Sequence, residues 1–476
     1  MSYLGIDDEQ LIRYANSVSP AARQPNVLAD GEAAAIGVSA PGGASANEGV
    51  AANEAEPARI GSLDWNTADQ VGGASASDRV GLATAEVAAA AERFARAALT
   101  AIVEPGDTDA AVLVGALGPG QALTSIVTGW TCSRIIDTVG AADAASGQTL
   151  TDRIDAALER WRPRLSLRSV MVALDAAVHQ HVVLVTPEDT MWPRGFGDLG
   201  DGTPVAVWVR GDPALLHSLE RSVALVGARA ATGYGEHVAM EAAAGLSDRG
   251  FATVSGGAYG IDGAVHRATL ASDSTTIAFL AGGVDRLYPA GHTELLRRIS
   301  DRGLLVGELP CGSSPTKWRF LQRNRLIAAA ARATVVVEAG RRSGSLNTAG
   351  HAAAIGRPLG AVPGPVTSPA SAGCHRLIRE YGAQCVTDAA EIAELAGVVD
   401  APTLFDDAET GAARPQPTDS AAVVRLLDAL APRSARSVQE LAVRTGMSVR
   451  DVVATLGVLD IEGRVVDHGG TWVKSR

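Results

Sequence analysis

The sequence predicts an α/β protein whose largest domain, residues 181–395, is a doubly wound and mostly parallel sheet. Short runs of β-branched and other apolar residues alternate there with helical segments, which is the order of βαβ units. The runs are apolar throughout rather than at every second residue, as in parallel strands that helices cover on both faces. Glycine-rich turns follow three of these runs, which favours a ligand site at the carboxyl ends of the strands. We expect a small helical domain before this sheet and a winged-helix domain after it.

The N-terminal part of the chain divides into two segments by composition. Residues 1–82 consist largely of Ala, Gly, Ser, Asn and Glu, and residues 1–80 carry 4 Arg against 11 Asp and Glu. Such a composition buries too little apolar surface to offset the entropy lost on folding, so we expect a disordered acidic extension. Residues 83–180 have a helical pattern, broken at Pro105-Gly106 and at Gly118-Pro119, and are expected to form a small helical domain.

The expected strands of the central domain are short apolar runs bounded by turn residues. These runs are residues 182–185, 205–209, 223–226, 252–254, 276–280, 304–306, 334–337 and 359–362. Helical patterns separate them, for example over residues 236–249 and 263–271.

The C-terminal part is expected to contain a linker and a winged helix. Residues 396–418 hold several prolines and are predicted to be the linker. Residues 419–476 then show a helix over 420–430, a second helix that opens with the capping box Ser437-x-x-Glu440, a third from Ser448 and a hairpin over 464–473. This module carries 8 basic against 7 acidic residues, which is a weak basis for phosphate binding and leaves partner docking or dimerisation open.

Composition places the chain in a broad class. Its 476 residues, 46% hydrophobic and 20% charged, suit a globular protein of about three domains. The four cysteines lie far apart without metal or redox spacing, and we find neither a secretory signal nor a membrane-spanning segment. We therefore expect a cytoplasmic protein that does not enter a membrane.

The distribution of charge favours a nucleic-acid partner although the net charge is −12. Residues 221–388 carry 18 Lys and Arg against 12 Asp and Glu, which is a net charge of +6. Within this block, residues 317–342 hold seven basic groups and the single acid Glu338. A solvated arginine-rich helix face is the alternative explanation of such a run.

Three glycine-rich turns supply the first candidate site residues. A glycine turn that opens a helix presents free N–H groups and the positive end of the helix dipole to an anion. The candidates in these turns are Gly227, Arg229, Ser255, Gly256, Gly257, Gly282 and Gly283. None of the turns is a dinucleotide fingerprint or a Walker loop, and each alone is also compatible with a plain strand-to-helix turn. For the nearby Asp262 and Asp285 we prefer a capping or turn-forming role to a catalytic one.

The segment from Pro315 to Ala328 supplies the strongest candidates. It places an ammonium, a ring and guanidiniums close together, so cations can neutralise successive phosphates while the ring stacks on an unpaired base. Its candidates are Lys317, Phe320, Arg323, Asn324 and Arg325, and the hydroxyl-rich turn Ser343, Gly344 and Ser345 follows a later strand. One of the two rings Trp318 and Phe320 is expected in the core, and Glu338 is expected to be a buried partner of Arg325.

The sequence contains no recognisable catalytic constellation. The nine histidines do not pair with Cys, Asp or Glu at metal-ligand spacing, and no serine lies in a G-x-S-x-G elbow. We therefore expect no metal, no cofactor and no enzymatic activity.

Taken in order, the central motifs resemble those of the DNA-processing protein A family, DprA, also called Smf. The similarity covers about residues 205–388 densely. The motifs that carry it are Val-Gly-Ala-Arg229 with Tyr-Gly235, Ser255-Gly-Gly-Ala-Tyr-Gly-Ile-Asp262, Tyr288-Pro289, Phe320-x-x-Arg-Asn-Arg-Leu-Ile-Ala328, Ser343-Gly-Ser-Leu346, Ala361-Val-Pro-Gly364 and Gly373-Cys-His-Arg-Leu-Ile378. One departure is Leu321-Gln322, where the family more often has a pair that contains proline.

The resemblance implies an extended Rossmann fold that binds single-stranded DNA, forms a homodimer and loads a RecA-type recombinase during natural transformation. It also implies that Arg229 and Lys317 lie in the DNA groove and that Phe320 contacts bases. Two alternatives stay open. One is a nucleotide-binding protein of the phosphoribohydrolase-like group, although the stretch from Gly340 to Leu346 lacks that group's acid. The other is an interaction scaffold that does not bind DNA.

Overall fold

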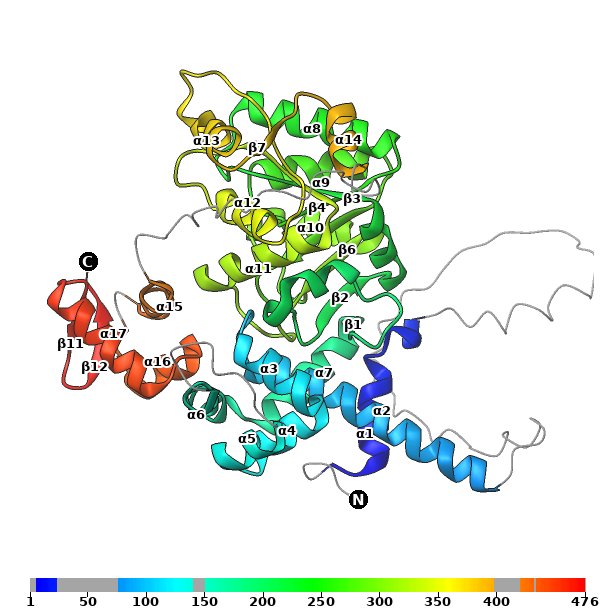
Figure 1. Ribbon diagram of the computed structural model, residues 1–476, viewed down its shortest axis with the longest axis vertical. Helices are drawn as coiled ribbons and strands as arrows, with labels where there is room; N and C mark the ends of the chain where they lie inside the picture. Colours follow the sequence, from blue (N-terminus) through cyan, green and yellow to red (C-terminus); the bar gives the residue numbers. More distant parts are fainter. Residues whose placement is uncertain (1–5, 24–75, 140–149, 398–419, 432–433, 476) are drawn as a thin grey trace, which may run out of the picture.

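The computed structural model describes residues 6–23, 76–139, 150–397, 420–431 and 434–475. In Figure 1 a helical domain lies below a large sheet domain, and a small C-terminal domain lies to one side of both. The expected linker, residues 396–418, falls almost entirely outside the described residues.

Nine strands of the described chain form one sheet in the order β1-β2-β6-β5-β4-β3-β7-β8-β9. All neighbouring pairs from β6 to β9 are parallel, whereas β2 is antiparallel to both β1 and β6. The strands are β1 Val182–Val185, β2 Val207–Gly211, β3 Ser222–Gly227, β4 Ala252–Ser255, β5 Thr276–Leu280, β6 Leu304–Gly307, β7 Ala333–Glu338, β8 Leu359–Ala361 and β9 Gln384–Cys385. The expected mostly parallel sheet is thus confirmed; only the two-residue β9 had no predicted counterpart.

Helices cover both faces of the sheet, which makes the fold doubly wound. One face packs against α8 Gly233–Asp248, α9 Ile261–Ala271, α10 Thr293–Arg302 and α14 Ala389–Gly397, and the other against α11 Lys317–Ala330, α12 Ser345–Ala354 and α13 Ala372–Glu380. In β3 the side chains of Val223 and Leu225 lie in the core beneath α8, α9 and α14, whereas those of Ala224 and Val226 lie in the core beneath α11, α12 and α13. Because successive side chains of a strand point to opposite faces, a strand between two helix layers is predominantly apolar along its whole length.

The helical domain begins earlier in the chain than predicted. Its helices are α1 Asp8–Ser17, α2 Ala76–Ile102, α3 Thr108–Leu117, α4 Pro119–Val127, α5 Cys132–Val139, α6 Leu150–Trp161 and α7 Leu167–His179. The expectation that all of residues 1–82 form an extension is wrong for residues 6–23, because α1 is capped by Asp7 and buries Leu11 and Ala15 against α2. The expectation for residues 24–75 lies outside the described residues.

The C-terminal module has the predicted winged-helix arrangement. It consists of α15 Ala421–Ala429, β10 Arg436–Ser437, α16 Val438–Thr445, α17 Val449–Ile461, β11 Val465–Asp467 and β12 Thr471–Lys474. The Ser437 hydroxyl accepts a hydrogen bond from the Glu440 N–H, as its capping-box sequence predicts. Gly446 ends α16 in the left-handed conformation with φ of 67°.

Short 3-10 helices connect several of these elements. They are η1 Pro20–Arg23, η2 Arg162–Arg164, η3 Arg194–Gly202, η4 Pro213–Arg221, η5 Ala290–His292 and η6 Pro369–Ser371. Within the described part of the chain, no single helix is long and apolar enough to cross a membrane, and the one adjoining pair that passes the same test, α3 with α4, is bent by 112°.

Candidate nucleic-acid interface

A groove of about 810 Å³ runs along the carboxyl edge of the sheet. Its walls are the β3–α8 turn, the first half of α11 and the loop between β7 and α12. Parallel strands end there together, which is where an open α/β sheet offers its ligand site. The sequence-predicted residues that line the groove are Gly227, Arg229, Lys317, Phe320, Arg323, Asn324, Ser343, Gly344 and Ser345.

The centre of the groove is the Phe320 ring with cations beside it. The Arg229 guanidinium carbon lies 4.8 Å from the ring centroid and that of Arg323 lies 5.6 Å away. The Tyr288 ring is tilted against Phe320 with centroids 5.8 Å apart. Arg229 and Tyr288 are exposed, and Phe320 is half-buried. The groove therefore offers a π surface with a guanidinium beside it, a combination that suits an unpaired base and the phosphate next to it.

Arg323 forms the floor of the groove rather than an exposed wall. Its Nη1 donates to the carbonyls of Gly256 at 2.7 Å and Phe279 at 2.5 Å. Burial lowers the pKa of Arg323 to about 10, against the opposing effect of the Asp262 carboxylate. Because two carbonyls hold it in place, this guanidinium is fixed under the Phe320 ring before any ligand binds.

Asp262 is part of the same floor. Its carboxylate accepts hydrogen bonds from the N–H groups of Gly256 at 3.1 Å and Ala258 at 3.3 Å. Burial raises its pKa, and the Arg323 charge acts in the opposite direction. Asp262 lies in the first turn of α9, whose N-cap is Gly260. It therefore holds the β4–α9 loop instead of capping the helix, which agrees with the structural role preferred from the sequence.

The hydroxyl-rich loop forms the opposite wall. The hydroxyls of Ser343 and Ser345 lie 2.7 Å apart, and Asn324 Nδ2 donates to Asn347 Oδ1 at 3.1 Å. Asn324 thus ties α11 to α12 and sets the width of the groove. Arg342, exposed in this loop, also lines the groove.

Six of the sequence-predicted site residues do not line the groove. They are Ser255, Gly256, Gly257, Gly282, Gly283 and Arg325, and all six are buried. The Ser255 hydroxyl donates to the Leu225 carbonyl at 2.7 Å, and a β-carbon at Gly256 would collide with the Arg323 guanidinium. A β-carbon at Gly282 would lie 2.7 Å from the Ser313 carbonyl oxygen. These residues allow close packing beneath the groove, so sequence position alone did not distinguish glycines that pack from glycines that face a ligand.

Arg325 has a different partner from the expected one. Its guanidinium makes a two-pronged ion pair with Glu308, with distances of 2.8 and 2.7 Å, and its Nε donates to the Gly202 carbonyl at 3.0 Å. Glu338 instead accepts from the Thr232 N–H at 2.8 Å and from its hydroxyl at 2.7 Å, which fixes the start of α8. The predicted pairing of Glu338 with Arg325 is therefore wrong, because α11 directs Arg325 toward β6 and away from the end of β7.

Sequence reasoning missed several residues that line the groove, and three of them bring an exposed aromatic ring or charge to it. Tyr288 and Arg342 were not selected, although Tyr288 belongs to the Tyr288-Pro289 motif and Arg342 to the basic run, and these were the available signals. Asp428, from α15 of the winged helix, also lines the groove. No sequence signal links residue 428 to residue 317, because their contact depends on how two domains dock.

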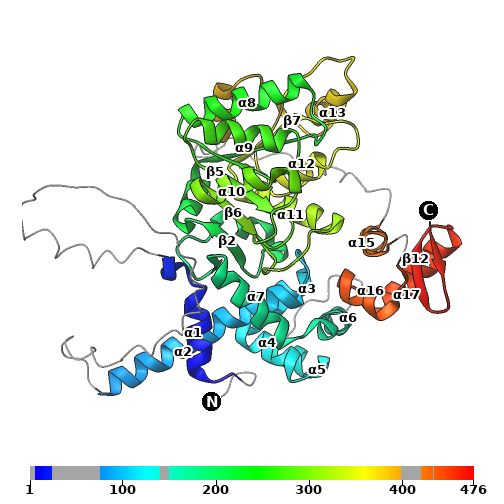
Figure 2. The same cartoon turned by 180° about the vertical axis from the view of Figure 1, so that it is seen from behind.

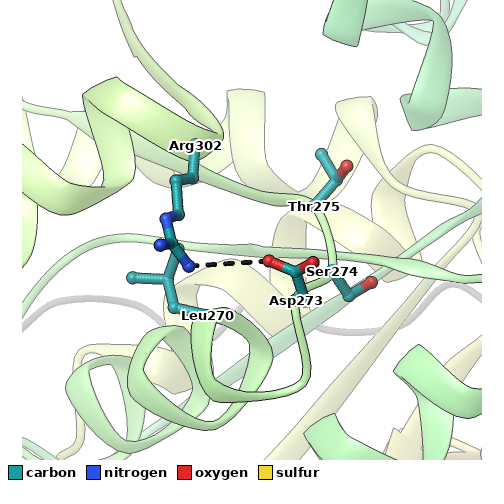
Figure 3. A pocket seen from close by; sticks show the side chains of 5 residues that line it. All are labelled: Leu270, Asp273, Ser274, Thr275 and Arg302. Carbon is teal, nitrogen blue, oxygen red and sulfur yellow. Dashed lines mark hydrogen bonds and ion pairs between the residues drawn. The ribbon is translucent and has the colours of Figure 1, made fainter.

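A smaller hollow of about 290 Å³ lies at the opposite edge of the sheet, beside the starts of β5 and β6 (Figure 3). Arg302 and Asp273 face each other across it at 3.5 Å, and both side chains are largely exposed. An exposed pair of this length contributes little, and it already satisfies its own charges. We assign no function to this hollow. In the described residues, no group of three or more His, Cys, Asp and Glu side chains is placed to hold a metal ion.

The fold and the groove define a Rossmann-like protein with a basic, aromatic-centred groove at the carboxyl edge of its sheet and a winged-helix domain beside it. The chain belongs to the DprA/Smf family. The model of the DNA recombination-mediator protein A family matches residues 183–397, and the model of the DprA winged-helix domain matches residues 410–471.

The chain is similar to several curated proteins of this family. It is 48% identical over 299 residues to a putative DNA processing protein DprA of Mycobacterium tuberculosis, which covers 61% of this chain and 76% of that protein. It is 34% identical over 322 residues to the protein Smf of Escherichia coli, covering 66% and 82%. The X-ray structure of DNA processing protein A from Streptococcus pneumoniae aligns with a TM-score of 0.50 and 26% identity, covering 64% of this chain and 97% of that one. The predicted family is thereby confirmed.

Proposed function

We propose that this protein binds single-stranded DNA in the groove centred on Phe320. The observation that carries the proposal is the set of exposed cations around this ring: Arg229 beside it, Lys317 one helical turn away, and Arg342 on the opposite wall. Duplex DNA keeps its bases stacked and paired, so the ring is accessible only to an unpaired strand. Membership of a DNA recombination-mediator family supports the same ligand.

We also propose a role in the cell, which membership of the family supports. The bound strand is handed to a RecA-type recombinase, as incoming DNA is during natural transformation, and the protein acts in the cytoplasm as a homodimer without catalysing a reaction. The loop from Gly340 to Leu346 brings two hydroxyls and the Arg342 guanidinium to the groove and no carboxylate, which supports binding over hydrolysis of a nucleotide.

The test is a binding titration of the full chain with fluorescent oligo-dT and with a duplex of equal length across a salt series. We expect tighter binding of the single strand. A plot of the logarithm of the association constant against the logarithm of the salt concentration should fall with a slope of about 0.7 for each phosphate contact. Equal affinity for both DNAs, or a folded protein that binds neither, would overturn the proposal.

A further inference from the structure

The winged-helix domain reaches one end of the groove. In both views of the molecule α15 lies beside α11 (Figures 1 and 2). Asp428 Oδ2 accepts a hydrogen bond of 2.7 Å from the backbone N–H of Lys317, the first residue of α11. Asp428 is the one groove-lining residue that comes from outside the Rossmann-like domain. Of the two acids that line the groove, Asp262 is buried under Arg323 and Asp428 is exposed.

A carboxylate at this point occupies a position that suits a phosphate. The first turn of a 14-residue helix presents N–H groups without helical partners and the positive end of the helix dipole. The Lys317 ammonium adds a full positive charge at the same end of the groove. A DNA phosphate and the Asp428 carboxylate are both oxygen anions, so both are attracted to these groups and only one can hold the Lys317 N–H.

A second contact between α15 and α11 involves a cation that lacks part of its hydrogen bonding. The Arg425 guanidinium, also from α15, stacks on the Trp318 ring with its central carbon 4.0 Å from the ring centroid. Burial lowers the pKa of Arg425, although the Glu104 carboxylate acts against that effect. Its Nε is buried without a hydrogen-bond partner among the described residues. A desolvated and partly unpaired guanidinium costs free energy, so this contact is one that a competing ligand can displace.

We propose that the winged-helix domain competes with single-stranded DNA for this end of the groove, with Asp428 in the place of a phosphate. The inference rests on the proposed function. In the free protein the docked domain covers the start of α11; when a strand binds, α15 leaves Lys317. The apparent association constant for DNA is then that of the open groove multiplied by the fraction of molecules in which the domain is undocked.

The first test compares Asp428→Asn with the unchanged full chain in oligo-dT binding. The substitution keeps the shape of the side chain and removes its charge, so we expect binding about 3- to 10-fold tighter. Asp460→Asn is the matched control, because it removes the same charge from the exposed end of α17, outside the groove, and should leave the affinity unchanged.

The second test measures hydrogen exchange of the unchanged protein with and without saturating oligo-dT. We expect faster exchange in residues 420–431 and 434–446 on DNA binding, because α15 and α16 lose their packing against α11 and η2. Binding of oligo-dT with equal affinity by the parent and Asp428→Asn, or weaker binding by the variant, would overturn the competition and leave the proposed function standing. Absence of binding by both proteins would instead overturn the proposed function.

Discussion

Two clusters of basic residues share the first turn of α11 and serve different purposes. Around Glu104, Arg164 of the helical domain and Arg319 of the Rossmann-like domain both form ion pairs with the carboxylate. In the groove, Arg229 and Lys317 are exposed, and no acid of the Rossmann-like domain faces them at the surface. The first cluster is buried and largely paired, so its charges hold domains together. The second leaves its charges available, so they can bind an external anion.

Helix α11 belongs to both clusters. Arg319 donates to both oxygens of Glu104, with Nε–Oε2 at 3.0 Å and Nη2–Oε1 at 2.7 Å. Lys317 and Arg323 of the same helix line the groove. The comparison teaches that the density of arginine along a helix does not by itself indicate nucleic-acid binding. A basic residue with a buried carboxylate partner holds domains together, whereas one without such a partner is available to an external anion.

The largest expected effect comes from removing the central acid of the buried cluster. Glu104→Gln leaves the Arg164 and Arg319 guanidiniums without their shared ionic partner, and the free energy of unfolding should fall by about 3 to 5 kcal/mol. Urea unfolding of the full chain measures this. Glu86→Gln, an exposed change on α2, the helix that precedes Glu104, is the control and should be nearly neutral. A decrease in the free energy of unfolding of less than about 1 kcal/mol would show that the cluster does not hold the domains together.

The same carboxylate predicts a pH dependence of stability. Burial alone would raise its pKa, but Arg164 and Arg319 lower it to about 2, from an ordinary value of 4.5. A group whose pKa is lower in the folded state stabilises the protein above its unfolded pKa and loses that contribution as the pH falls through the folded one. The parent should therefore lose stability between about pH 4.5 and 2 more steeply than Glu104→Gln. Parallel curves from the two proteins would contradict the assignment.

In the groove, the largest expected effect is that of the central ring. Phe320→Ala should weaken oligo-dT binding by about 1 to 3 kcal/mol, because a stacking surface for a base is lost. Fluorescence anisotropy measures the affinity, and the thermal unfolding midpoint shows whether the fold is kept. A variant that loses its fold together with binding would place Phe320 in the core instead of the interface.

The exposed cations should act mainly on the salt dependence. Lys317→Ala and Arg229→Ala should each reduce the slope of log affinity against log salt by about 0.7, one phosphate contact each. Arg298→Ala, which removes an exposed arginine of α10 that does not line the groove, should leave the slope unchanged. An unchanged slope for Lys317→Ala or Arg229→Ala would remove that residue from the interface.

The smallest expected effect is that of the second ring. Tyr288→Ala should weaken oligo-dT binding by about 0.5 to 1.5 kcal/mol, because Tyr288 supports Phe320 from the side. Tyr288→Phe keeps the ring and should bind like the parent. If the phenylalanine variant weakened binding as much as the alanine variant, the hydroxyl would be the contact rather than the ring.

The local pattern of residues determined the secondary structure and most of the groove. Continuous apolar runs located β1 to β8 because a strand covered on both faces is predominantly apolar. Capping residues such as Ser437 located helix starts because free N–H groups need acceptors. Phe320 and Lys317 were identifiable because a ring and cations at close spacing have few structural uses at a surface. Helix α1 was missed since its few apolar residues stabilise it only against α2.

Only the tertiary structure decided which charges pair and which remain free. Arg323 and Arg325 are two residues apart in one helix, yet one forms the groove floor and the other is tied to Glu308. In the same way, Asp428 reaches Lys317 only through the docking of two domains. Hydrophobic periodicity depends only on residues that are close together in the sequence, so it can be recognised without the fold. The pairing of a buried charge depends on which distant group the fold brings within hydrogen-bond distance, and one sequence does not carry that information.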